Sequence, residues 1–359
     1  GDAFRSIVKY DERRDIYQTD VVLPTVTLAA GESTSASTQL FAGAKEWATI
    51  RDYENAQNVK GFLDSIDWGW FFFLTKPIFF VLHWLNATFT GLGIAGSMGW
   101  AIIALTLLIK AALFPLAYKS YASMAKMREL QPQMAEMKEK YGDDRQKMQQ
   151  ATMELYKKEK VNPASGCLPI LLQIPIFFSL YKVIFVTLEL RHAPWIGWIK
   201  DLSAPDPTSI LNLFGLLPNA TPEPGSIFFI LSLGVLPILL GISMWIQQKL
   251  NPAPTDPTQQ MIFAWMPWVF MFMLGSLASG LVLYWCANNI LTCTQQYAIM
   301  RSQGVDVDLL GNIKSTFKKK PKAPQLPMPS IRASAASRTS SLNLLLVASA
   351  SSVAAGYGW

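Results

Sequence analysis

The sequence predicts an all-α polytopic membrane protein with a five-helix transmembrane core and a cytoplasmic helical hairpin. Two features lead to this prediction. Hydrophobic residues make up 51% of the 359 residues and charged residues only 16%, whereas soluble domains carry about 25% charged residues. Apolar segments of roughly 17–25 residues, the length that crosses a bilayer, recur along the chain.

The N-terminal segment, residues 1–67, is polar and irregular. Residues 21–28 predict a β-strand, and Pro24 within them suits the edge of a sheet. A segment of this length is too short to hold a large core alone. We therefore expect it to be the C-terminal remnant of an extracytoplasmic β domain. The start at Gly1 instead of a methionine predicts a processed or partial chain.

Residues 68–97 are predicted to form an interfacial amphipathic helix and a connector. Lys76, His83 and Thr90 recur at helical spacing and make one polar stripe, while aromatic residues occupy the rest. This pattern is typical of a helix that lies in the membrane interface. By its length alone the segment could also cross the bilayer as a sixth span.

Five apolar segments are predicted to span the bilayer. They are expected at 98–118, 163–188, 226–246, 261–278 and 279–300. The polar connections between them are a cytoplasmic helical hairpin at 119–162, a periplasmic loop at 189–225 and a cytoplasmic loop at 247–260. A basic, disordered cytoplasmic tail is expected at 301–359.

The expected orientation follows from the distribution of charge. The hairpin, the 247–260 loop and the tail together hold nineteen basic and ten acidic residues. Residues 1–76 and the 189–225 loop hold ten basic and fifteen acidic residues. Because basic residues are retained on the cytoplasmic side, the hairpin and tail are predicted to be cytoplasmic and the N-terminal segment periplasmic.

The hairpin segment carries an apolar seam among its charges. Met127, Leu130, Met134, Met137 and Tyr141 recur at spacings of three and four residues, as in a coiled coil. Methionine-rich surfaces adapt to partners of varied sequence. The seam predicts two packed helices in water, although a solvated spacer would carry the same charges.

Lys110 is the basic residue nearest the middle of a predicted span. A charged side chain there costs about 2.5–3.5 kcal/mol, and every Asp and Glu lies outside the spans or at a membrane edge. We therefore expect Lys110 to face a water-filled cavity within the bundle, with snorkelling to the interface as the alternative. Lys76 and Lys182 lie nearer the membrane edge and are expected to snorkel.

Other polar side chains lie at membrane depth. Thr106 precedes Lys110 by one helical turn, and Gln173 lies in the second span. A polar stripe in the fifth span comprises Asn288, Asn289, Thr292, Gln295 and Gln296. These residues suit the wall of a hydrophilic groove, and ordinary hydrogen bonds between helices would explain the stripe equally well.

The sequence contains none of the motifs that would indicate an enzyme. G-x-G-x-x-G, H-E-x-x-H and the phosphate-binding loop are all missing, and neither His83 nor His192 accompanies a membrane-embedded serine. The three cysteines make no C-x-x-C pair. We therefore predict no catalytic residue, no metal and no cofactor.

Ten short segments spread over residues 68–303 match one known family. They read YASMAKMR at 121–128, LQP at 130–132, YGDD at 141–144, VNP at 161–163, GCLP at 166–169, QIP at 173–175, ELR at 189–191, DLS at 201–203, MP at 266–267 and SGLVLY at 279–284. On these segments the chain resembles the YidC-type membrane protein insertases, the bacterial members of the YidC/Oxa/Alb family. Residues 1–67 resemble the end of that family's periplasmic β-sandwich domain.

The resemblance implies a multi-pass protein of the bacterial inner membrane with a groove open to the cytoplasm and the lipid. Lys110 sits where the family carries a positive residue that attracts acidic residues of the substrate. Bacterial relatives usually have arginine there, and lysine lacks its fork geometry. Together with the polar residues above, the expected substrate groove comprises Lys110, Thr106, Gln173, Tyr284, Trp285, Asn288 and Asn289.

The resemblance also implies partners. The hairpin is expected to receive substrate through Met127, Met134, Met137 and Tyr141, and the tail to contact the ribosome or anionic lipid through Lys318, Lys319, Lys320 and Lys322. Nascent membrane proteins are the implied substrates, with the Sec translocon as a further candidate partner. The residues leave two alternatives open: a secondary transporter of a small solute, and a membrane-protein assembly factor that does not insert.

Overall fold

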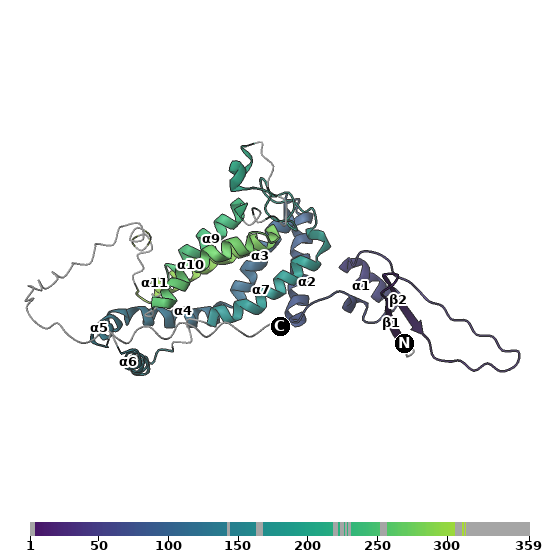
Figure 1. Cartoon of the computed structure of the whole chain (residues 1–359), viewed down its shortest axis with the longest axis horizontal. Helices are drawn as coiled ribbons and strands as arrows, with labels where there is room; N and C mark the ends of the chain where they lie inside the picture. The colour runs from purple at the N-terminus through teal and green to yellow at the C-terminus, as the bar shows by residue number, and fades with distance from the viewer. Residues whose placement is uncertain are drawn as a thin grey trace, which may run out of the picture. The chain divides into compact units, whose positions relative to one another are not determined.

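The computed structural model describes residues 4–141, 144–162, 168–217, 231–251 and 257–305, together with five isolated positions. The fold is mostly helical and begins with one β-hairpin (Figure 1). The chain divides into one unit that ends at Asp306 and another that begins at Val307. The elements below all belong to the first unit.

The β-hairpin pairs β1 (Arg5–Asp11) with β2 (Ile16–Val22) in antiparallel register, from Arg5 opposite Val22 to Asp11 opposite Ile16. Nearly all of its side chains are exposed, so the hairpin buries no core of its own. The predicted strand at 21–28 is wrong beyond its first two residues. Pro24 lacks the backbone N–H that would continue the ladder.

The N-terminal segment also contains a helix that the sequence interpretation missed. α1 (Trp47–Ala56) is followed by the short 3-10 helix η1 (Phe62–Ser65). Ile50 is fully buried, and the Trp47 ring packs 5.1 Å from the ring of His83. Trp47 and Ile50 lie three residues apart, and this helical spacing was the signal available in the sequence. The N-terminal segment is therefore not irregular throughout, because α1 packs on the long helix that contains His83.

α2 (Phe72–Gly91) buries one face and exposes an aromatic one. Its buried residues recur every three or four positions and are Thr75, Ile78, Phe79, Leu82 and Leu85. This face packs against α3 and α7. Large aromatic side chains, among them Phe80 and Trp84, remain exposed on the other side.

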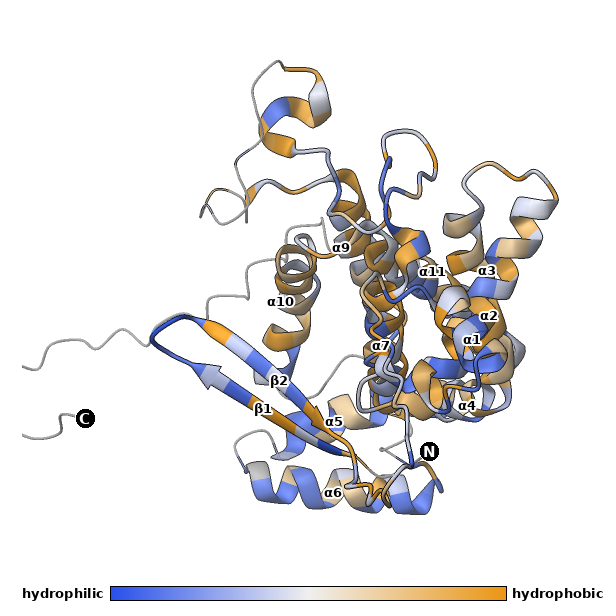
Figure 2. Ribbon diagram, turned by 90° about the vertical axis from the view of Figure 1, so that its right-hand side faces the viewer, coloured by the Kyte–Doolittle hydropathy of each residue, from blue (hydrophilic) through white to orange (hydrophobic). Residues whose placement is uncertain are grey.

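The helical body consists of α2, α3 (Ser97–Ala112), α4 (Phe114–Glu129), α7 (Leu168–Val186), α9 (Val235–Gln248), α10 (Pro257–Leu274) and α11 (Ser279–Ser302). α11 packs against α3, α4, α7 and α9, and α10 packs against α9. Figure 2 shows hydrophobic residues over most of α9 and α10 and hydrophilic residues over most of α6. The core therefore lies between α11 and its neighbours.

α3 and α4 meet at a bend of 68°. Pro115, in the first turn of α4, lacks the N–H that would bond the carbonyl of Ala111, which explains why the helix breaks here. Taken singly, none of the described helices combines the length and hydropathy expected of a membrane span. α3 and α4 meet that criterion only as a bent pair.

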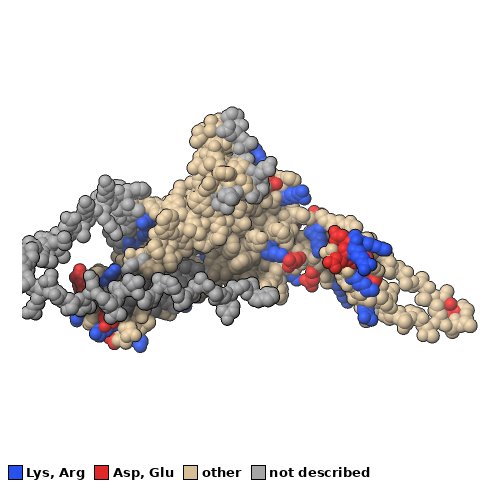
Figure 3. Space-filling view, in the orientation of Figure 1, with Lys and Arg blue, Asp and Glu red and all other residues tan. Residues whose placement is uncertain are grey.

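Outside α4, charged side chains are scarce in the helical body. α2, α3, α7, α9, α10 and α11 contain no Asp or Glu, and their basic residues are Lys76, Lys110, Lys182 and Arg301. On the face seen in Figure 3, the middle of the body is almost free of charge. These six helices therefore offer no carboxylate partner to any of the four cations.

The predicted hairpin comprises α5 (Gln131–Tyr141) and α6 (Arg145–Lys158), which pack together. Leu130 and Met134 of the seam are buried, and Met137 is half-buried. The Tyr156 hydroxyl of α6 lies 3.5 Å from the Met134 sulfur. Met134 of the seam therefore lies at the contact between the two helices.

Several sequence predictions fall outside the described residues. They concern the start of the second span at 163–167, the region 218–230 apart from three isolated positions, and part of the loop at 252–256. The basic tail with Lys318, Lys319, Lys320 and Lys322 also lies outside them.

Candidate functional site

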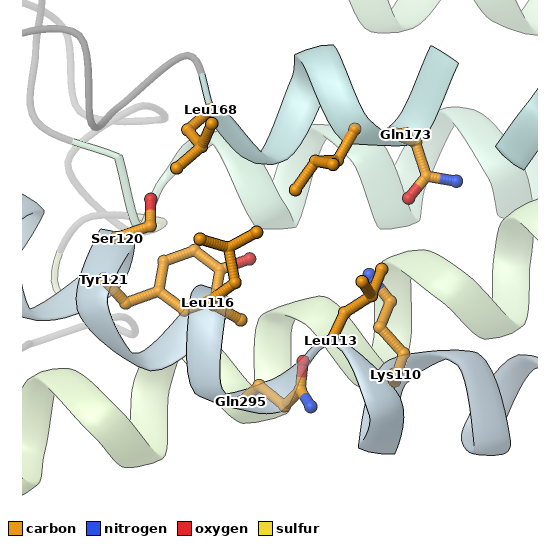
Figure 4. A pocket seen from close by; sticks show the side chains of 10 residues that line it. Lys110, Leu113, Leu116, Ser120, Tyr121, Leu168, Gln173 and Gln295 are labelled. Atoms are coloured by element: carbon orange, nitrogen blue, oxygen red, sulfur yellow. The ribbon is translucent and has the colours of Figure 1, made fainter. Parts of the chain in front are cut away.

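A cavity of about 40 Å³ lies between α3, α4, α7 and α11 (Figure 4). One water molecule needs roughly 10–15 Å³ of such space, so the cavity can hold water. Its lining is mixed, with polar groups from all four of these helices on an otherwise apolar wall. The lining residues are Lys110, Leu113, Leu116, Ala117, Ser120, Tyr121, Leu168, Leu172, Gln173 and Gln295.

Lys110 lies in the last turn of α3, just before the bend. Its ammonium Nζ donates a hydrogen bond to the Thr292 hydroxyl of α11 at 2.7 Å. That hydroxyl donates in turn to the Asn288 carbonyl at 2.6 Å. Among the described residues, no carboxylate lies within ion-pairing distance of Lys110. The cation is therefore held by a neutral group.

Two other lysines of the helical body, one in α2 and one in α7, have carboxylate partners. Lys76 Nζ lies 2.6 Å from Asp64 Oδ1, and Lys182 pairs with Asp67. Both aspartates come from the segment that precedes α2. The expectation that these two lysines snorkel stays a prediction, and each of them also has an aspartate partner within the protein. Lys110 differs from them because no neighbouring loop supplies an acid.

Gln173 of α7 faces the cavity opposite Lys110 (Figure 4). Its amide Nε2 donates to the Tyr284 hydroxyl of α11 at 2.6 Å. Tyr284 is almost fully buried. The bond fixes the amide at the cavity wall and joins two helices that the sequence separates by more than a hundred residues.

The remaining predicted groove residues do not line this cavity. Thr106 is buried, and its hydroxyl donates to the Ile102 carbonyl of its own helix at 2.7 Å. Asn289 donates to the Ser243 hydroxyl of α9 at 3.0 Å. Trp285 packs among aromatic rings of α7 and α10. Asn288 is linked to Lys110 through its backbone carbonyl, which accepts the hydrogen bond of the Thr292 hydroxyl.

The sequence interpretation missed the wall that α4 contributes. Leu113, Leu116, Ser120 and Tyr121 lie on it at helical spacing. That spacing was the available signal, but the segment was divided at residue 118 between a predicted span and the hairpin. The structure continues it as one helix through Glu129. The cavity therefore extends from the bundle to the base of the hairpin.

The loop after α7 closes the opposite end of the bundle. The Asp206 carboxylate accepts the backbone N–H of Leu236 at 2.7 Å, at the start of α9. The Leu202 carbonyl accepts the N–H of Gly280 at 2.8 Å, at the start of α11. The first N–H groups of a helix have no partner within it, so this loop supplies their acceptors. A Cβ at Gly280 would lie only 3.1 Å from that carbonyl.

Asp201 in the same loop accepts hydrogen bonds from the backbone and hydroxyl of Ser203 at 2.8 and 2.7 Å. Burial raises the pKa of this carboxyl, but these bonds and the neighbouring His192 outweigh it, so the pKa lies below its ordinary value. The loop is thus fixed by an ionised acid. Over the part of the chain that the structure describes, no cluster of His, Cys, Asp and Glu could hold a metal ion.

Comparison with known proteins identifies the class to which this helical body belongs. Residues 89–305 match the 60Kd inner membrane protein family, and the chain belongs to that family. Residues 2–81 match the YidC periplasmic domain. The chain is therefore an inner membrane protein with a periplasmic segment, as the sequence predicted, and its β-hairpin belongs to that segment.

The relatives carry one name. The membrane protein insertase YidC of Ruegeria sp. is 74% identical over 319 residues, which cover 89% of this chain and 51% of that protein. YidC of Roseobacter denitrificans is 72% identical over 318 residues, with the same coverage. The chain thus spans about half the length of these relatives. The predicted resemblance is confirmed.

One solved structure is also similar. It is the crystal structure of an active YidC insertase with its first transmembrane domain resolved, at 26% identity and a TM-score of 0.49. The match covers 70% of this chain and 51% of that one.

Proposed function

We propose that this chain forms the core of a membrane protein insertase. It takes hydrophobic segments of nascent membrane proteins into a hydrophilic intramembrane groove and passes them to lipid. One observation carries the proposal: Lys110 faces a cavity in the bundle and, among the described residues, its ammonium is held by the neutral Thr292 hydroxyl and by no carboxylate. A cation in this state can accept a carboxylate from another molecule.

The proposed arrangement has a five-helix transmembrane core of α3, α7, α9, α10 and α11. α2 lies in the interface, and α5 and α6 stand in the cytoplasm. The charge distribution supports this orientation, since basic residues dominate the hairpin and the tail. The loop that caps α9 and α11 is then periplasmic and closes the groove on that side.

The proposed mechanism needs no nucleotide and no covalent step. Water in the groove lowers the cost of bringing a hydrophilic flank into the plane of the bilayer. A carboxylate on that flank is attracted to Lys110, and the low dielectric strengthens the attraction. The carboxylate takes the place of the Thr292 hydroxyl on the ammonium. The apolar part of the segment then leaves sideways into lipid.

The partners follow from this mechanism. Nascent membrane proteins are the substrates, and the methionine seam of the hairpin receives them before they reach the cavity. The ribosome, the Sec translocon and anionic lipid are proposed as further partners, with the ribosome or lipid at the basic tail.

Site-specific photocrosslinking tests the proposal. A crosslinker at Gln173 faces the cavity, whereas one at the neighbouring Ile174 is exposed and outside its lining. We expect ribosome-bound nascent chains to crosslink to position 173 and only weakly to position 174. Crosslinks only to mature complexes would contradict insertion and indicate an assembly factor. Uptake of a small solute into vesicles that contain the protein would indicate a transporter.

A further inference from the structure

Two adjoining cavities lie where the chain enters α2, beside α7. They have volumes of about 380 and 510 Å³ and share Trp68 and Gly69 in their walls. Both fall in the size range of small-molecule sites, roughly 300–1,000 Å³. We call this pair of cavities the corner site.

The smaller cavity is almost entirely apolar. Its wall is aromatic, with Trp68, Trp70, Phe71, Phe178 and Tyr181 around it. Trp70 is 94% exposed and Tyr181 is 41% exposed, so two large rings stand open to the surroundings. Trp and Tyr are enriched where a membrane protein meets the headgroup region, because their rings are apolar and their polar atoms remain wet.

The larger cavity is bordered by charges of both signs. Asp64 and Lys76 line it as one ion pair, and Asp67 pairs with Lys182, which lines the smaller cavity. The hydrogen bond from Lys182 holds the pKa of the Asp67 carboxyl below its usual range, and the Gly69 N–H reinforces it. The rim thus presents two cations and two anions, joined as two ion pairs.

The turn at Gly69 fixes this geometry. Its φ of +72° lies in the left-handed region, which favours glycine. Its N–H donates to Asp67 Oδ1 at 3.0 Å, and a Cβ there would lie 3.4 Å from the Lys182 side chain. The turn therefore sets Asp67 against Lys182 at the wall that the two cavities share.

We propose that the corner site binds a glycerophospholipid with a zwitterionic ethanolamine headgroup. An acyl chain lies against the aromatic wall, and the headgroup lies at the charged rim. The phosphate faces Lys76 and Lys182, while the ammonium donates to Asp64 and Asp67. A zwitterion matches a rim of zero net charge, whereas an anionic headgroup would also meet two carboxylates. This inference rests on residence in the inner membrane and not on insertion.

Native mass spectrometry of the full chain can test the site. The protein would be released from micelles that contain equal amounts of phosphatidylethanolamine and phosphatidylglycerol, and the lipids retained would be counted. We expect the wild type to retain phosphatidylethanolamine about threefold or more over phosphatidylglycerol, the effect of one or two net hydrogen bonds. Equal retention, or a preference for phosphatidylglycerol, would overturn the proposal.

Two sets of variants locate the binding. Trp70→Ala with Tyr181→Ala removes exposed rings, so the fold should persist, and the retained phosphatidylethanolamine should fall. Phe80→Ala is the matched control, because this ring is 58% exposed on α2 and lines neither cavity. Asp64→Asn with Asp67→Asn should shift retention toward phosphatidylglycerol. Wild-type retention by the ring variant would overturn the proposal even if insertion assays succeed.

Discussion

Lys110 and Lys182 show how one residue type serves two ends of the same helical body. Lys182 has only 20% of its side chain exposed, and Asp67 reaches it from the segment before α2. The Lys110 ammonium instead donates its hydrogen bond to the Thr292 hydroxyl. Asp67 is itself 77% exposed, but it compensates the Lys182 charge within the protein. A cation bonded to a neutral partner can exchange it for an incoming carboxylate.

The difference comes from where the acids lie in the chain. The segment before α2 provides Asp64 and Asp67, which reach lysines near the ends of α2 and α7. α2, α3, α7, α9, α10 and α11 carry no acid, and no carboxylate of the described residues pairs with Lys110 in the last turn of α3. The lack of a carboxylate partner for Lys110 thus depends on the composition of the whole bundle.

Removing the Lys110 charge should produce the largest effect. Lys110→Ala should lower the insertion of acidic-flanked single-span substrates by roughly ten- to a hundredfold, the equivalent of one charged hydrogen bond. Protease protection of the substrate in proteoliposomes, at equal protein level, measures this. Lys110→Arg should retain most of the activity, and the exposed Lys60→Ala is the control. Normal insertion by Lys110→Ala would remove the charge from the mechanism.

Giving Lys110 a resident acid should make it resemble Lys182. In Thr292→Asp, the new carboxylate would occupy the ammonium and compete with the substrate. We expect insertion to fall by about tenfold, or about 1.4 kcal/mol, while the melting temperature stays at or above that of the wild type. Thr292→Ser retains the hydroxyl and should behave like the wild type. Unchanged insertion by the aspartate variant would show that the ammonium is not where substrates bind.

The closed end of the bundle should respond in stability instead of activity. Asp206→Ala removes an acceptor at the start of α9, and loss of such a cap costs about 0.5–2 kcal/mol. We therefore expect a lower melting temperature in detergent. Asp206→Asn keeps an acceptor oxygen and should lose less. A melting temperature equal to that of the wild type would show that the loop does not stabilise α9.

The smallest expected effect concerns pH at the paired lysine. Since the folded pKa of Asp67 is lowered, its contribution to stability is present above the unfolded pKa, about 3.9, and is lost as the pH falls through the folded pKa. Asp67→Asn should therefore melt below the wild type at neutral pH, and the gap should close on acidification. A gap that widens in acid would contradict the assignment.

The sequence pointed to Lys110 as the candidate groove lysine but not to the group that holds it. Composition and periodicity predicted the helices, and the lack of an acid marked Lys110 as unusual. Its bond to Thr292 spans 182 positions and depends on the register between α3 and α11, which packing sets. For the same reason the aspartate partners of Lys76 and Lys182 could not be predicted, and the approach of Asp67 to Lys182 depends on the turn at Gly69. The bend before α4 could have been predicted from Pro115.

The loop that caps α9 and α11 also determines at which end the helices of this bundle can separate. α11 is tied at Gly280, whereas Gln295 lies fifteen residues further on, about 22 Å along the axis. If α11 tilts about its anchored first turn, the displacement of its residues grows with their distance from that turn. Residues near the cavity would therefore move further than those near Gly280. We expect the helices to separate at the end near the hairpin while the loop keeps the opposite end closed. A substrate segment could then enter the bundle without opening a path for ions.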